Sequence, residues 1–148
     1  MDHTTFADTV VSRCAYYRRI CGLPAGIQSS RSRIVVRAGM IGAITMPGSL
    51  GRRVRDDLLH RRMILGPVIC HVRSGRLTYL CRPDLPDDVR LFSKLFALNV
   101  SIVPPGGEIA LPSPADSRSE YRCWIVLPRD TFRPSGLVLV DAIAKVAK

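Results

Sequence analysis

Apolar and polar residues alternate along the chain with two different periods, and the changes of period predict where helices and strands lie. In TTFADTVVSRCAYYRRICG (residues 4–22) the apolar positions recur at helical spacing. Thr5, with Asp8 three residues later, forms a weak capping-box pattern at the start, and Gly22 and Pro24 mark the end. The segment therefore predicts a first helix.

Short runs rich in β-branched residues predict strands that pair as hairpins. RIVVRA and IGAITM lie on either side of Gly39 and predict one hairpin, and a helix follows from Pro47 through about Met63. VSIV and EIAL flank PPGG and predict another hairpin. The polar loop PSPADSRSE then leads to the strand YRCWIVL, and SGLVLVDAIAKVAK predicts the last helix.

The segment VRLFSKLFALN (residues 89–99) has apolar residues nearly all round a helix. Only Arg90 and Lys94 interrupt them. A helix that is apolar on every side is usually buried, so the pattern predicts a deeply packed helix.

The hairpin GPVICHVRSGRLTYLCRP (residues 66–83) alternates with period two. Taking Ser74 and Gly75 as its turn places Arg73 opposite Arg76, His71 opposite Thr78 and Ile69 opposite Leu80. One face, which we expect in the core, then carries Val68, Cys70, Val72, Leu77, Tyr79 and Cys81. The other, more polar face carries His71, Arg73, Arg76 and Thr78.

Successive hairpins separated by helices predict an α+β fold: a largely antiparallel sheet with helices packed on one face. With 148 residues, 47% of them apolar, the chain fits one domain over residues 1–148. The N-terminus has no continuous apolar signal region, and no stretch reaches the eighteen or so apolar residues of a membrane span. We expect a soluble, cytoplasmic protein with no membrane contact.

The formal charge of +10 is unevenly placed. Residues 1–82 carry fourteen Arg against four Asp, whereas residues 83–148 carry eight basic and eight acidic residues. Clustered cations gain affinity for a polyanion by releasing its counterions. A GC-rich genome would also enrich arginine, but the segregation of charge favours a nucleic-acid partner.

The helix from Pro47 to Met63 concentrates this charge. Helical spacing pairs Asp56 and Asp57 with arginines four residues away, so the two acids predict surface ion pairs rather than a metal site. The same spacing leaves Arg55 and Arg62 free on a stripe with Arg52. This stripe predicts phosphate contacts, although a solvated helix face has the same pattern.

The sequence predicts no cofactor and no metal. The five cysteines form no CxxC pair and lie in apolar runs, which is typical of reduced core thiols. PPGG and GSLG lack the Lys and Ser or Thr of a phosphate loop and predict turns. His71 has no carboxylate near it in sequence, so a hydrogen-bonding or phosphate-contacting role is favoured over catalysis.

Four segments, GPVICHVRSGRLTYLCRPDLPDD, LFSKLFALNVSI, GGEIALPSPAD and YRCWIVLPRDTFRPSG, resemble small actinobacterial proteins catalogued as DNA-directed RNA polymerase subunit beta. The resemblance covers most of residues 12–142. A chain of 148 residues cannot hold the double-psi barrel catalysis of that enzyme, so the resemblance implies no polymerase activity.

Residues 66–82 are also similar to a stretch of actinobacterial primase-polymerase-like proteins, in which a Gly-Pro-Val strand turns into GR and a second strand. Active members need an acidic pair on one strand, a downstream strand histidine and a further acid to hold two metals and a nucleotide. His71 matches the histidine, but no predicted strand carries Asp-x-Asp or Asp-x-Glu. The resemblance implies a degenerate domain without catalysis.

Three hypotheses follow. The first is a non-enzymatic protein that contacts DNA or RNA phosphates through Arg52, Arg55 and Arg62 together with the hairpin residues His71, Arg73 and Arg76. The second is a regulatory or interaction module for an acidic protein partner in transcription or replication. The third, a small enzyme using His71, has the least support.

Overall fold

The computed structural model describes residues 9–28, 30, 32–119 and 121–148. The helices are α1 (Val10–Arg19), α2 (Gly48–His60), α3 (Val89–Ala97), α4 (Pro114–Ser119) and α5 (Gly136–Val146). The strands are β1 (Gly26–Gln28), β2 (Arg33–Arg37), β3 (Gly42–Pro47), β4 (Val68–His71), β5 (Arg76–Cys81), β6 (Ser101–Ile102), β7 (Glu108–Leu111) and β8 (Arg122–Val126). The α+β class predicted from the sequence is confirmed.

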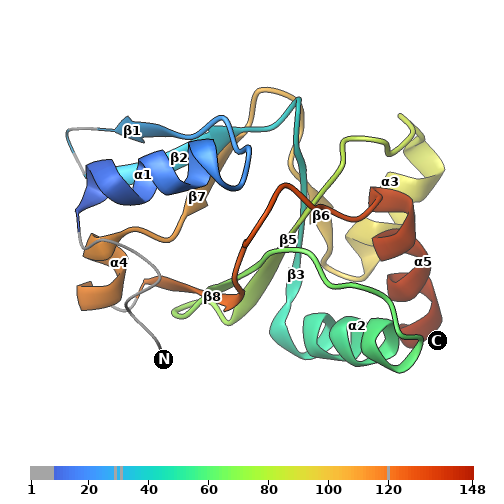
Figure 1. The fold of residues 1–148 in the computed structure, drawn as a ribbon. Helices are drawn as coiled ribbons and strands as arrows, with labels where there is room; N and C mark the ends of the chain where they lie inside the picture. The colour runs from blue at the N-terminus through green and yellow to red at the C-terminus, as the bar shows by residue number, and fades with distance from the viewer. Residues whose placement is uncertain (1–8, 29, 31, 120) are drawn as a thin grey trace.

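The strands form two antiparallel sheets where the sequence predicts one. A small sheet has the order β1-β2-β7, and a large sheet has the order β6-β3-β5-β4-β8. Figure 1 shows the large sheet between two groups of elements: the small sheet with α1 and α4 on the left, and α2, α3 and α5 on the right. Within the described residues, no helix is long and apolar enough to cross a membrane.

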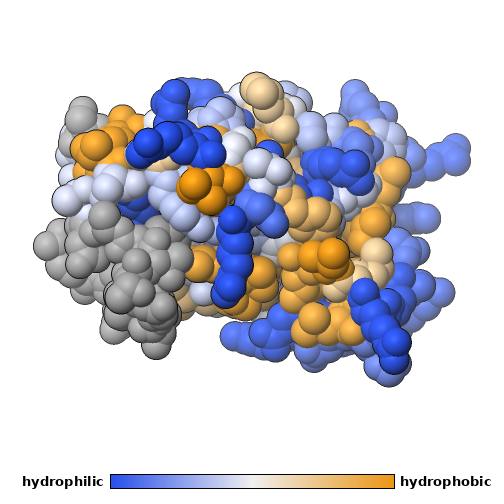
Figure 2. All heavy atoms as spheres, viewed as in Figure 1, coloured by the Kyte–Doolittle hydropathy of each residue, from blue (hydrophilic) through white to orange (hydrophobic). Residues whose placement is uncertain are grey.

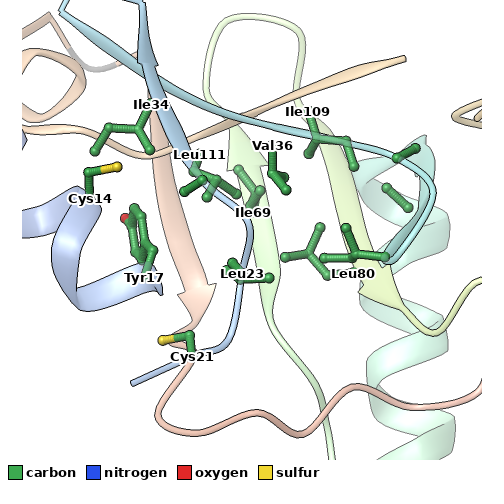
Figure 3. Packing of buried hydrophobic residues seen from close by; sticks show 14 residues of the cluster. Cys14, Tyr17, Cys21, Leu23, Ile34, Val36, Ile69, Leu80, Ile109 and Leu111 are labelled. Carbon is green, nitrogen blue, oxygen red and sulfur yellow. The ribbon is translucent and has the colours of Figure 1, made fainter. Parts of the chain in front are cut away.

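Both faces of the large sheet are covered at its centre. On one face Ile69 and Leu80 pack with Tyr17 of α1 and with Ile34 and Leu111 of the small sheet, as Figure 3 shows. We call this group the first core. Fully buried side chains at Ile69, Leu80 and Tyr17 are expected to contribute several kcal/mol each, about the cost of truncating a core side chain to alanine.

The opposite face of the large sheet packs on helices and forms the second core. Ile44 and Tyr79 of the sheet contact the cluster that contains Val54 of α2 and Leu139 of α5. These four side chains are almost fully buried. Because β5 is covered on both sides, every residue from Leu77 to Cys81 is buried, and the period-two alternation of exposure is lost.

Two of the three predicted hairpins are wrong in their pairing. β2 and β3 lie in different sheets, and so do β6 and β7. β2 pairs with β7 through Ile34 opposite Leu111, and β3 pairs with β5 and β6. The glycine-rich turns at Gly39 and Gly106 do reverse the chain, but a turn signal does not say which sheet edge the next strand joins.

The β4–β5 hairpin forms as predicted, but its register differs by two positions. The turn spans Val72–Gly75, so His71 lies opposite Arg76 and Ile69 lies opposite Thr78. A shift of two positions leaves each residue on its predicted face, because sheet faces alternate with period two. Tyr79 and Cys81 are buried as predicted, and Cys70 is half-buried. Val72, predicted in the core, lies in the turn and is 47% exposed.

The predicted positions of the helices agree with the structure better than their predicted burial does. α2 and α5 lie within the predicted segments. α1 starts after Thr9, whose Oγ1 accepts a hydrogen bond from the Ser12 amide at 3.0 Å, and the predicted start at Thr5 and Asp8 lies outside the described residues. The predicted burial of α3 is wrong: Phe96 is 81% exposed, because α3 covers only the edge of the large sheet.

Candidate functional site

The candidate site is the polar end of the large sheet, beside the β4–β5 turn. On the face that carries the first core, the side chains change from apolar to polar toward this turn. The polar residues there are Thr45 of β3, His71 of β4, Arg76 and Thr78 of β5, and Arg122 of β8. We call them the polar face. Strand register brings them together, since Thr45 pairs with Thr78, and His71 pairs with both Arg76 and Arg122.

His71 lies at the centre of the polar face. Its Nε2 is 2.7 Å from Oγ1 of Thr78, which fixes the imidazole ring against β5. Burial lowers the pKa of His71, and the positive charges of Arg122 and Arg76 lower it further, whereas Asp116 acts in the opposite direction. The imidazole is therefore neutral at pH 7 and offers a hydrogen bond rather than a charge.

Arg122 is held by a buried carboxylate. Its Nη1 donates to Oδ1 of Asp116 at 2.9 Å, and the Arg122 and Asp116 side chains are 17% and 5% exposed. The other carboxylate oxygen accepts from the amide and hydroxyl of Ser113 at 2.9 and 3.2 Å. This pair neutralises the Arg122 charge and ties β8 to α4.

Two arginines lie at this end of the hairpin, Arg73 in the turn and Arg76 as the first residue of β5. Arg76 donates from Nη2 to the Asn99 carbonyl at 2.9 Å, and its Nε lies 3.4 Å from Oγ1 of Thr45. The guanidinium carbon of Arg73 lies 4.2 Å from the centroid of the Tyr121 ring, a cation–π contact. In the described part of the chain, the ion pairs include neither Arg73 nor Arg76.

The structure brings Arg52 to the same turn. Gly48, at the start of α2, packs so closely on the Gly75 carbonyl that a side chain at position 48 would collide with it. A Cβ on Gly48 would also lie only 3.1 Å from Nη1 of Arg52, so the Arg52 guanidinium lies beside the same part of the turn. The exposed Arg52 of α2, Arg73 of the turn and Arg76 of β5 therefore all lie beside the β4–β5 turn, and we call them the arginine cluster.

The predicted stripe on α2 is not formed as expected. Arg55 is half-buried and its Nε lies 3.7 Å from Oδ1 of Asp56, so it is not free. Arg62 follows the end of α2 with a positive φ of 59°, which turns it out of the helical array. Of the predicted ion pairs, Asp57 with Arg61 is present at 2.7 Å, whereas Arg53 donates to the Val146 carbonyl. Figure 2 shows hydrophilic side chains gathered along α2 all the same.

A separate hollow of about 670 Å³ lies between α3 and the β3–β6 edge of the large sheet. Its walls are largely apolar and include Phe92, Phe96 and Ile102, with Arg82 and Asp87 among the lining residues. No residue of the polar face or of the arginine cluster lines it. The exposed α3 side chains thus border a cavity that is distinct from the candidate site.

The sequence identified His71, Arg73 and Arg76 but missed the role of Arg122 and Asp116. Arg122 lies on β8, which the sequence predicts as a strand. Its place beside His71, however, depends on the pairing of β8 with β4, which no local pattern specifies. Asp116 belongs to the short helix α4, which lies within a predicted loop. Among the described residues, no group of three or more His, Cys, Asp or Glu side chains could hold a metal ion.

Comparison of the chain with protein-family models, curated proteins and solved structures finds no match.

Proposed function

We propose that the protein binds the phosphates of DNA or RNA through the arginine cluster, without base-specific recognition. The observation that carries this proposal is that Arg52, Arg73 and Arg76 all lie beside one turn, with none of the three in an ion pair of the described part of the chain. Clustered guanidinium groups bind phosphate oxygens with two parallel hydrogen bonds each.

The surroundings of the cluster suit a phosphate backbone. The neutral His71 ring can donate one hydrogen bond to a phosphate oxygen without requiring acid pH. Tyr121 is 42% exposed and already stacks with Arg73, so the two together present a flat, cationic surface to an unpaired base. These contacts favour affinity over sequence discrimination, because phosphates are alike at every position.

The test is fluorescence anisotropy with labelled single- and double-stranded oligonucleotides. If three phosphates are engaged, affinity should fall about fortyfold between 50 and 200 mM monovalent salt. A double charge reversal, Arg52→Glu with Arg73→Glu, should weaken binding by more than tenfold at low salt. Arg76 is left unchanged because its bond to the Asn99 carbonyl also supports the turn.

The matched control is Arg90→Glu with Arg129→Glu. Both residues are exposed and lie outside the polar face, and the control changes the net charge by the same amount. We expect the control to retain most of the affinity. Failure of the wild type to bind at 50 mM salt would refute the proposal, and an equal loss in both double variants would show that bulk charge acts in place of the cluster.

A further inference from the structure

Cys70 and Cys123 are neighbours across two antiparallel strands. Cys70 of β4 lies directly opposite Cys123 of β8, and the neighbouring Cys70 thiol contributes to the raised pKa of Cys123. Both are free thiols in the structure, Cys70 half-buried against the second core and Cys123 exposed. The other three cysteines, Cys14, Cys21 and Cys81, are buried.

The backbone geometry at this pair allows a disulfide, but a strained one. The Val72 amide donates to the Tyr121 carbonyl at 3.0 Å, which is one of the two bonds of a hydrogen-bonded pair, while the Tyr121 amide donates to the Asp116 carbonyl. Hydrogen-bonded and non-hydrogen-bonded pairs alternate along an antiparallel ladder, so Cys70 and Cys123, two positions further on, are also of the hydrogen-bonded kind, with Cα atoms about 5.5 Å apart. This Cα separation is within the range of disulfides, but the Cβ atoms of a hydrogen-bonded pair are about 5.5 Å apart, wider than the roughly 3.5–4.5 Å of a relaxed bridge. Closing the bridge therefore requires the two strands to shift and leaves the disulfide strained.

We propose that Cys70 and Cys123 are a thiol modification site that forms a reversible intramolecular disulfide by exchange with a low-molecular-weight disulfide of the glutathione type. The exposed Cys123 thiolate attacks one sulfur of the oxidant, forms a mixed disulfide and releases one thiol. The Cys70 thiolate then attacks the Cys123 sulfur and releases the second thiol. Two protein thiols are oxidised, one small disulfide is reduced to two thiols, and the two protein protons are transferred to them.

The environment of each thiol directs the reaction to this pair. Burial raises the pKa of Cys21 to about 11 and that of Cys81 to about 12, and both side chains are out of contact with solvent, so neither provides an accessible thiolate. Burial and the neighbouring Cys70 also raise the pKa of Cys123, so exchange should be slow at neutral pH and faster in alkali. The product is an exposed cross-strand bridge, a type that reductants open readily.

The bridge would link β8 covalently to β4 next to Tyr121 and Arg122, although the inference does not rest on nucleic-acid binding.

The test uses the purified full-length protein, incubated with oxidised glutathione at about pH 8.5, then denatured and alkylated. We expect the intact mass before alkylation to be lower by two hydrogens, the number of alkylated thiols to fall from five to three, and one peptide to link Cys70 to Cys123. Dithiothreitol should restore all five.

Two single variants and one physical measurement make the test decisive. Cys70→Ser should stop at a stable mixed disulfide on Cys123, and Cys123→Ser should leave Cys70 largely unmodified. The bridged wild type should melt at a higher temperature, by less than the roughly 10 °C expected from closing a loop of this length, because strain in the bridge offsets part of the gain. A stable glutathione adduct on the wild type, a disulfide-linked dimer, or five alkylated thiols after prolonged oxidation would each overturn the proposal.

Discussion

Replacing Asp116 by Asn tests whether the buried ion pair fixes the polar face. The substitution keeps the shape of the side chain and an oxygen that can accept from Ser113, but removes the charge opposite Arg122. Breaking a buried pair by removing one partner costs about 3–5 kcal/mol, because the remaining charge is left without compensation. In the described structure Nε of Arg122 is also buried without a hydrogen-bond partner, so the guanidinium has little alternative bonding.

The expected loss lies at the lower end of that range, about 3 kcal/mol, since Asn retains part of the Ser113 contact and Arg122 is 17% exposed. For a chain of this length, such a loss lowers the melting temperature by roughly 10 °C. Urea denaturation followed by tryptophan fluorescence measures it directly, because Trp124 is the only tryptophan and lies two residues from Arg122.

An exposed ion pair provides the matched control. Arg37 and Glu108 are 3.6 Å apart with side chains 69% and 39% exposed, so Glu108→Gln should change the free energy of unfolding by less than about 1 kcal/mol. Equal small losses in Asp116→Asn and Glu108→Gln would refute the reasoning. They would mean that Arg122 reaches solvent when its partner is neutralised, and that the ion pair does not hold β8 against α4.

Three further outcomes are expected. Tyr79→Phe removes the buried hydrogen bond from the Tyr79 hydroxyl to the Gly51 carbonyl, 2.5 Å long, and should cost about 1–3 kcal/mol in urea denaturation. His71 has a pKa lowered from 6.5 by burial and two nearby guanidinium groups, so the unfolded state binds a proton first as the pH falls. Wild-type stability should therefore be fully present above about pH 6.5 and decline below it through the folded pKa, whereas His71→Gln should decline less when denaturation is repeated at each pH. Phe96→Ser should leave the melting temperature within about 2 °C, because the side chain is 81% exposed.

Local pattern predicted the elements well and their partners poorly. The faces of the β4–β5 hairpin were predictable, because the period of two survives any register shift by an even number. The register was not, since Ser74 and Gly75 are compatible with a two-residue turn and with the observed four-residue turn, in which Gly75 has a φ of 72°. The division into two sheets depends on long-range pairing, which turn residues do not encode.

In the candidate site, too, the residues of one hairpin could be predicted and the residues from distant elements could not. His71, Arg73 and Arg76 could be found because one hairpin carries all three. Arg122 and Asp116 come from elements far along the chain, and only the pairing of β8 with β4 brings them to His71. Local pattern also overstated the α2 stripe, because helical spacing was extended past His60, where the helix ends.

The pairing of β2 with β7 has a consequence for the order in which the protein can be assembled. β2 ends at Arg37, but the strand that completes its sheet begins only at Glu108. During synthesis one edge of β2 therefore stays unpaired until most of the chain has been made, and an open strand edge can template aggregation. Arg33 and Arg37 flank the apolar residues of β2, and charged flanking residues of this kind discourage association between nascent chains.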